Sequence, residues 1–244
     1  MKKITVLMGR EVKAYFTSPL AYLVLTSLLV VSGLDFYLMV SAMNGVEVSI
    51  GAPFSPFFGG FIFYWFFMLV VPPVLTMRLL AEEVKSNTIE TLMTAPVSDT
   101  QVVLAKYFSS LLLFMFLWLP TIVYVLYLGV YTDLDSGPIL SGYLGTMLLG
   151  AMFLAAGLFA SSLTSNQVVA AVLGFTLCSS LFSIGLMEYL QPSQSGVWSY
   201  FNLHAYMLDF GKGVVDTRPI VYTLSTAMFF LFASIKALEK RRWS

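Results

Sequence analysis

Six long stretches of this sequence are almost free of charged residues, and they constrain its fold more than any other feature. They cover about residues 20–40, 57–77, 107–128, 139–163, 167–187 and 219–238. A helix needs roughly 20 mostly apolar residues to cross a bilayer, and these runs lack the strict alternation of barrel strands. We therefore expect an all-α integral membrane protein, with residues 1–244 forming a single domain of six transmembrane helices.

The composition excludes several other classes of protein. The chain is 58% hydrophobic and only 11% charged, against about 25% charged in ordinary soluble domains. Its many aromatic residues argue against disorder, and a single cysteine, Cys178, cannot form an internal disulfide. The 13 basic and 13 acidic residues balance, so nothing in the charge suggests a nucleic-acid partner.

The distribution of Lys and Arg predicts the orientation. With six spans, both termini lie on one side of the membrane, and that side carries 11 of the 13 basic residues. The other side carries Lys212 and Arg218. Because basic residues concentrate in cytoplasmic loops, we expect both termini in the cytoplasm.

Two features of the first span admit another interpretation. Val31-Ser32-Gly33 resembles a signal-peptide cleavage site, but the preceding residues 1–18 include Glu11 and a helical stripe, unlike a short basic leader. Asp35 lies inside the span, where a charge costs roughly 2.5 to 3.5 kcal/mol at the centre. We expect it to reach water or a partner helix near the outer edge; an ion or proton relay is the alternative.

Residues 2–17 form an amphipathic pattern before the first span. Apolar residues recur at helical spacing at Ile4, Leu7, Met8, Val12, Tyr15 and Phe16, and basic ones fall elsewhere at Lys2, Lys3, Arg10 and Lys13. This pattern is typical of a helix lying in the membrane interface. Ser18-Pro19 then ends it, so we expect an elbow helix, with a simple anchor as the alternative.

The longest inner loop is unusually acidic. It covers about residues 78–106 and carries Glu82, Glu83, Glu90 and Asp99. Asn87 followed by Glu90 predicts the start of a short helix that Pro96 ends. Ser98 with Gln101 predicts a capping box on a helix continuing into the third span. The acidic residues favour a protein partner over lipid headgroups, with a solvated linker as the alternative.

The outer segment at about residues 188–218 is rich in aromatic side chains. These are Trp198, Tyr200, Phe201, Tyr206 and Phe210. Such rings favour the headgroup region, so we expect a short helix or re-entrant piece at the outer interface. His204 and Met207 are too few ligands for a metal site.

Other motifs predict no chemistry by the chain itself. Nucleotide-binding and hydrolase signatures are absent from the sequence, so we expect neither enzymatic activity nor a cofactor. Pro72-Pro73 and Pro120 are expected to bend the second and third spans. Small residues from Gly150 to Ser161 line the fourth span, which fits either close packing or a sliding surface.

Three separated motifs resemble those of the ABC-2 type permeases, and within them the gliding-motility-associated permease subunit. The first, in the elbow, comprises Arg10, Glu11, Tyr15, Phe16, Ser18, Pro19, Ala21 and Tyr22. The second comprises Glu82, Glu83, Thr88, Ile89, Glu90, Leu92 and Pro96, followed by Lys106. The third precedes the sixth span and comprises Phe210, Gly213, Asp216, Arg218 and Tyr222. Asn87 departs from the glycine usual in the broader family, which leaves the geometry of the coupling segment open.

The resemblance implies an ABC-2 (type V exporter-like) permease of the bacterial inner membrane that works with a separate ATPase, which binds the ATP. The residues expected to contact that ATPase are Glu82, Glu83, Thr88, Glu90, Leu92 and Pro96. Six spans and no internal repeat suggest a homodimer, and the subgroup implies a membrane-anchored extracytoplasmic subunit. Two other functions stay open, namely an ATP-independent carrier or channel working through Asp35 and a non-transporting membrane scaffold.

Overall fold

The structure is a computed structural model that describes residues 2–43, 54–86, 88, 97–190 and 195–242. Its described elements are α1 (Lys2–Thr17), α2 (Pro19–Met43), η1 (Ser55–Phe57), α3 (Ile62–Thr76), α4 (Ala81–Lys85), α6 (Asp99–Trp118), η2 (Leu119–Thr121), α7 (Ile122–Gly129), α8 (Ser136–Leu163), α9 (Gln167–Leu190), α10 (Ser195–Trp198), η4 (Ser199–Phe201), α11 (Leu203–Gly211) and α12 (Thr217–Arg242). They are all helical, which confirms the predicted fold class.

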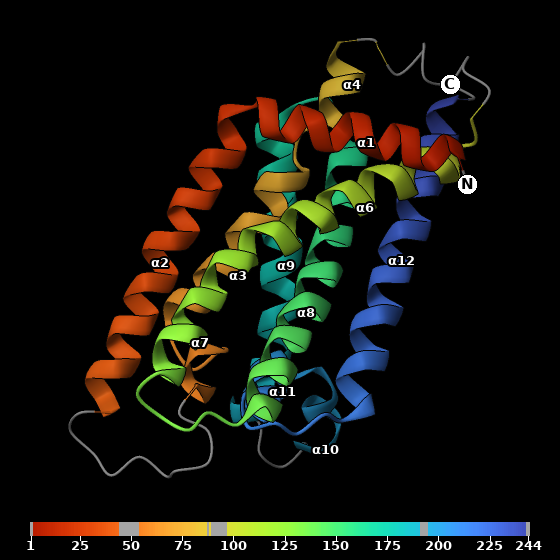
Figure 1. The fold of residues 1–244 in the computed structure, drawn as a ribbon. Helices are drawn as coiled ribbons and strands as arrows, with labels where there is room; N and C mark the ends of the chain where they lie inside the picture. Colours follow the sequence, from red (N-terminus) through yellow and green to blue (C-terminus); the bar gives the residue numbers. More distant parts are fainter. Residues whose placement is uncertain (1, 44–53, 87, 89–96, 191–194, 243–244) are drawn as a thin grey trace.

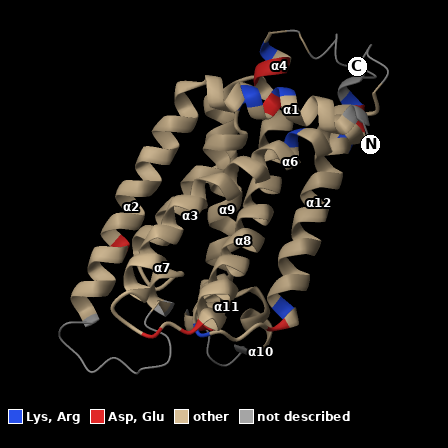
Figure 2. Ribbon diagram, in the orientation of Figure 1, with Lys and Arg blue, Asp and Glu red and all other residues tan. Residues whose placement is uncertain are grey.

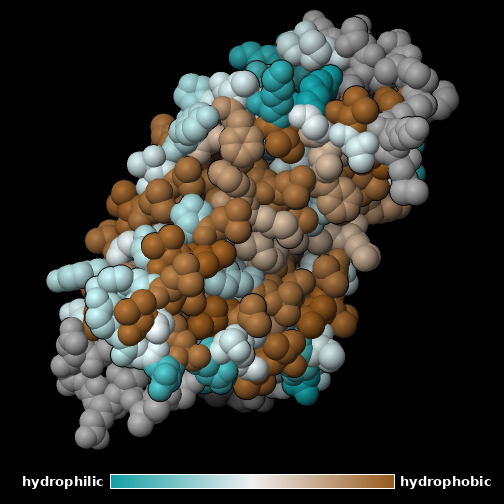
Figure 3. Space-filling view, in the orientation of Figure 1, coloured by the Kyte–Doolittle hydropathy of each residue, from teal (hydrophilic) through white to brown (hydrophobic). Residues whose placement is uncertain are grey.

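Six helical segments of the described chain are long and apolar enough to cross a membrane. They form a bundle, and α1 lies across one end of it beside α4 and the end of α12 (Figure 1). Short helices α10 and α11 lie at the opposite end (Figure 1). Charged residues gather at these two ends (Figure 2), and a broad hydrophobic band separates them (Figure 3). The prediction of six transmembrane helices is therefore confirmed.

Helix α8 is the core of the bundle, and its small residues explain why. Its glycines let neighbouring helices approach closely, as at Gly157, where an added Cβ would overlap the Thr76 hydroxyl of α3. A Cβ on Gly174 of α9 would lie 3.1 Å from Pro73 Cβ and 3.4 Å from Gly157 Cα. Three helices thus meet at two glycines and a proline, and the small-residue face serves close packing.

The prolines that were expected to bend the second and third spans lie in different helical surroundings. Helix α3 begins at Ile62, later than expected, and continues through Pro72 and Pro73. The Thr76 hydroxyl donates to the Pro72 carbonyl at 2.8 Å inside this helix. At Pro120 the α-helical pattern of the third span changes to the short 3-10 turn η2 before α7 continues. A proline removes a backbone donor, which explains the interruption.

The segment before the sixth span folds into short helices, as expected. One of its aromatic side chains, Phe210, does not lie in the headgroup region. Phe210 of α11 is only 2% exposed. It packs on α8 so closely that a Cβ on Gly145 would lie 2.6 Å from the ring. Phe210 is therefore a packing residue, which corrects its expected place in the headgroup region.

Candidate functional site

The elbow helix α1 is fixed to the end of the transmembrane bundle. Tyr15 is 1% exposed, and its hydroxyl donates to the Leu75 carbonyl of α3 at 2.8 Å. The Arg78 guanidinium lies 5.0 Å from the centre of the Tyr15 ring and donates to the Ser18 hydroxyl at 2.7 Å. Burial raises the pKa of Tyr15, although the charge of Arg78 opposes that rise, so the phenol remains a neutral donor.

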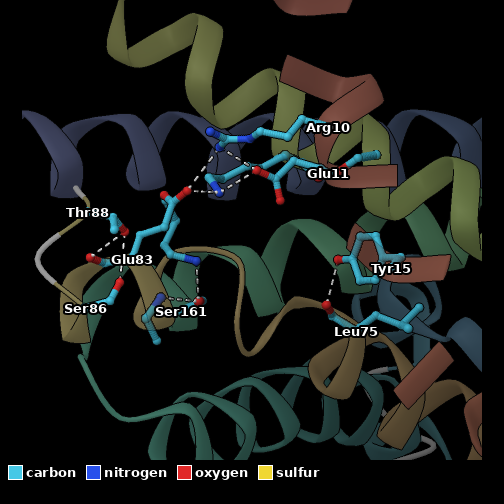
Figure 4. A network of polar contacts seen from close by, with 12 residues as sticks. Arg10, Glu11, Tyr15, Leu75, Glu83, Ser86, Thr88 and Ser161 are labelled. Atoms are coloured by element: carbon cyan, nitrogen blue, oxygen red, sulfur yellow. Dashed lines mark hydrogen bonds and ion pairs between the residues drawn. The ribbon is translucent and has the colours of Figure 1, made fainter. Parts of the chain in front are cut away.

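Four charged side chains connect the elbow helix α1 to two other helices, and we call them the Lys106 cluster. It consists of Arg10 and Glu11 on α1, Glu83 on α4 and Lys106 on α6. The Lys106 ammonium is 3% exposed, and it lies 2.8 Å from Glu83 Oε1 and 3.3 Å from Glu11 Oε1. Arg10 lies 2.9 Å from Glu11 and 3.5 Å from Glu83. Figure 4 shows Arg10 and Glu11 of α1 converging with Glu83 of α4.

The charge balance of the Lys106 cluster explains how the Lys106 ammonium can be buried. Two cations face two carboxylates, so the cluster is neutral. A buried ion pair is weak evidence of stability by itself, but loss of one partner leaves an uncompensated charge at a cost of about 3 to 5 kcal/mol. The four side chains therefore hold α1, α4 and α6 together as one unit.

Helix α4 is also tied to the core helix α8. It begins without a side-chain cap of its own, but the Ser161 hydroxyl of α8 accepts from the backbone N–H groups of Leu80 and Ala81 at 3.1 Å each. Ser161 also donates to the Met77 carbonyl at 3.0 Å. One buried hydroxyl thus satisfies three backbone groups at the turn from α3 into α4 (Figure 4).

A polar cleft of about 370 Å³ opens between α1 and α4. Tyr15, Arg78, Glu82, Glu83 and Lys106 are among its lining residues. Among the residues that the structure describes, Glu83 Oε2 is buried and has no hydrogen-bond partner. Glu82 is exposed, so the two adjacent carboxylates have different surroundings.

The structure places some of the predicted coupling residues and not others. Thr88 is exposed, and its hydroxyl lies 2.9 Å from that of Ser86. Glu90, Leu92 and Pro96 lie outside the described residues, as does the helix predicted to begin at Asn87. Of the two glutamates expected to face a partner, Glu82 is exposed while Glu83 points into the Lys106 cluster. The physical reason is the buried Lys106 ammonium, which needs an anion.

The elbow residues lie together at the junction of α1, α2 and α6. Phe16 packs edge-on against Phe116 of α6, with ring centroids 5.1 Å apart, and Pro19 opens α2. At the start of α6 the predicted capping box is confirmed, because Ser98 Oγ accepts from the Gln101 N–H and Gln101 Oε1 from the Ser98 N–H, both at 3.3 Å.

Sequence reasoning missed the parts played by Lys106 and Ser161. The sequence pattern identifies Lys106 only as a basic residue of an inner loop and as part of a motif. A lysine within a run that is otherwise apolar is itself a signal, because it needs a carboxylate from another element. Ser161 offers no such signal, because a serine among small residues is equally typical of helix packing.

Residues 34–208 match the family described as ABC-2 family transporter protein. The chain belongs to that family. It is therefore a multi-pass membrane protein and the membrane subunit of a transporter. The matched region holds the Ser161 anchor and two members of the Lys106 cluster, Glu83 and Lys106. Both α1 and α12 lie outside the match. No curated protein shows significant similarity to the chain.

Two surroundings were expected for Asp35, water or a partner helix. Asp35 is only 3% exposed, and its burial among neighbouring parts of the bundle fits the second. Its Oδ1 atom has no hydrogen-bond partner in the described part of the chain. An unpaired carboxylate in a span marks a candidate functional residue by default.

Proposed function

We propose that the chain is the membrane-spanning subunit of an ATP-driven ABC transporter that exports a substrate or transmits force across the bacterial inner membrane. A separate ATPase subunit binds the ATP and docks on the end of the bundle that carries α4. The observation that carries the proposal is the Lys106 cluster, because it joins α4, which carries the exposed Glu82, to the elbow and to a transmembrane helix.

The contacts of α4 give a route for force. A push on the exposed Glu82 of α4 acts on the adjacent Glu83 and through it on Lys106 at 2.8 Å. Lys106 lies on α6, which with η2 and α7 forms the third span. The same push acts on α8 through Ser161. Movement of α4 is thereby shared among the elbow and two spans.

The arrangement of the ends supports the orientation in this proposal. Helix α1, helix α4 and the end of α12 lie at one end of the bundle (Figure 1), and the sequence concentrates its basic residues there. By the bias of basic residues toward the cytoplasm, this end faces the ATPase. A second copy completes the transporter as a homodimer.

The process that the transporter serves is the finer part of the proposal. Resemblance of the elbow and of the approach to the sixth span favours the gliding-motility subgroup, with a membrane-anchored extracytoplasmic subunit as a further partner. Co-purification from native membranes tests this assignment. A large extracytoplasmic companion would support it, and its absence from an active complex would contradict it.

Charge reversal on the exposed face of α4 tests the ATPase contact. We expect Glu82→Lys to weaken ATPase association and ATP-dependent transport, because an exposed acidic residue favours a basic partner surface. Glu239→Lys is the matched control, since Glu239 on α12 lies at the same end with its side chain 39% exposed and pairs only with Lys236 at 2.7 Å in the described chain. Equal association of wild type and Glu82→Lys would contradict the proposed dock.

The burial of Asp35 favours one second candidate, an ATP-independent carrier or channel. An unpaired buried carboxylate in a span can bind a cation or proton. Transport by the purified chain alone, abolished by Asp35→Asn, would support this function. Transport that requires the ATPase and survives Asp35→Asn would exclude it.

A further inference from the structure

A second cleft lies at the end of the bundle away from α1, where η4 and α11 meet α12. It has a volume of about 360 Å³ and a mostly aromatic wall that includes Tyr200, Phe201, Tyr206 and Tyr222. Phe201 and Tyr222 pack edge-on, with ring centroids 5.5 Å apart. Arg218 contributes a charge to the cleft, so we call it the Arg218 cleft. The proposed route of force from α4 does not pass through these residues.

The contacts of the Arg218 guanidinium leave its two terminal nitrogens available as hydrogen-bond donors. Its Nε lies 3.5 Å from Asp216 Oδ2, and its Cζ lies 5.6 Å from the centre of the Tyr200 ring. The backbone N–H of Arg218 donates to Asp216 Oδ1 at 3.2 Å and lowers the pKa of that carboxyl, which therefore stays charged. In the described chain, neither terminal guanidinium nitrogen donates a hydrogen bond. An arginine held at one edge presents a planar fork that matches a phosphate.

An exposed apolar strip continues from the cleft along α12. Val221 is 65% exposed, Met228 67% and Phe232 60%, and their spacing puts them with Leu224 on one face of the helix. From Arg218 to Phe232 the helix rises roughly 21 Å at about 1.5 Å per residue. One leaflet of the hydrocarbon core is about 15 Å thick. The strip is therefore long enough to accompany an acyl chain through a leaflet.

We propose that the Arg218 cleft binds a membrane phospholipid. The phosphate of the headgroup accepts from the free guanidinium nitrogens of Arg218, and one acyl chain lies along Val221, Leu224 and Met228. A free phosphate ion would leave the aromatic wall and the strip unused, and a lipid without phosphate would leave the guanidinium fork unpaired. The site does not depend on the source of energy for transport.

Native mass spectrometry of the full chain in detergent, titrated with phosphatidylglycerol, tests this site. We expect Arg218→Gln to weaken retention of the lipid by roughly tenfold, because a charge-assisted pair of hydrogen bonds is lost. Arg218→Lys keeps the charge but not the planar guanidinium, so its retention of the lipid should lie between those of wild type and Arg218→Gln. Lys212→Gln is the matched control, since Lys212 is an exposed cation at the same end, and it should leave retention unchanged.

Two further arms keep the test decisive if Arg218→Gln folds poorly. Wild-type chain should retain diacylglycerol with the same acyl chains roughly tenfold more weakly than phosphatidylglycerol, and inorganic phosphate should not displace the phospholipid. Equal retention by Arg218→Gln and wild type, or equal loss in Lys212→Gln, would overturn the proposal. So would displacement by inorganic phosphate, or disulfide cross-linking between two copies of Met228→Cys in the membrane, which would show that a second copy covers the strip.

Discussion

Lys106 shows at the scale of a single residue how one buried charge organises an end of the molecule. Its ammonium is 3% exposed and contacts carboxylates on two other elements. We expect Lys106→Met to lower the free energy of unfolding by about 3 to 5 kcal/mol, because Glu11 and Glu83 lose their buried cation and keep only the exposed Arg10. Chemical unfolding in detergent measures this loss.

The exposed Lys85 supplies the control for that substitution. Lys85→Met removes an equal charge from α4 but should change stability by less than about 0.5 kcal/mol. Adding Glu11→Gln and Glu83→Gln to Lys106→Met should restore most of the lost stability. If Lys106→Met and Lys85→Met were equally stable, the cluster would not hold the three elements together.

Ser161 acts at the same scale through hydrogen bonds alone. We expect Ser161→Ala to destabilise the turn into α4 by about 1 to 3 kcal/mol, because two buried N–H groups lose their acceptor. Hydrogen exchange at Leu80 and Ala81 should accelerate. Ser162→Ala is the neighbouring control, since among the described residues the Ser162 hydroxyl bonds only to the Phe159 carbonyl of its own helix. Equal exchange in the two variants would contradict the anchor.

His204 gives the far end of the bundle a dependence on pH. Burial lowers its pKa below the usual value, with its ring 5.9 Å from that of Trp65. The unfolded chain therefore binds the proton more readily, so stability is lost as the pH falls through the usual histidine pKa toward the folded value. We expect His204→Gln to lose less thermal stability than wild type between pH 7 and 5. Identical pH profiles of the two proteins would contradict this role.

At the scale of elements, close contact between helices at a glycine makes that position sensitive to substitution. Gly157 of α8 leaves no room for a Cβ beside Thr76 and Pro73, so we expect Gly157→Ala to destabilise the bundle by about 1 to 3 kcal/mol. Gly9→Ala is the matched control, because a Cβ there meets nothing within 4 Å and improves helix propensity by about 0.5 to 1 kcal/mol. Thermal unfolding should move in opposite directions. A shift of the same sign in both would show that packing at Gly157 is not limiting.

The elements also show which parts of the molecule the sequence can predict. Spans follow from hydropathy, the elbow from helical spacing and the capping box at Ser98 from a local pattern. Helix α4 could not be located in this way, because its first N–H groups are satisfied by Ser161, some 80 residues away along the chain. The inward direction of Glu83 depends on that start and on Lys106. Both are tertiary contacts that leave no local pattern.

At the scale of the whole molecule, α4 connects an exposed surface to the interior of the bundle. Its outward face carries Glu82 and its inward face carries Glu83, which joins the Lys106 cluster. The other end of the bundle carries Lys212 in an exposed position. If the ATPase binds the α4 end, residues at that end contact it and residues at the opposite end do not.

Photo-cross-linking in native membranes tests this account most directly. A photoreactive amino acid in place of Glu82 should give an adduct with the ATPase subunit, identified by mass spectrometry, and the same group in place of Lys212 should not. An ATPase adduct at position 212, or none at position 82 in a complex that hydrolyses ATP, would contradict it.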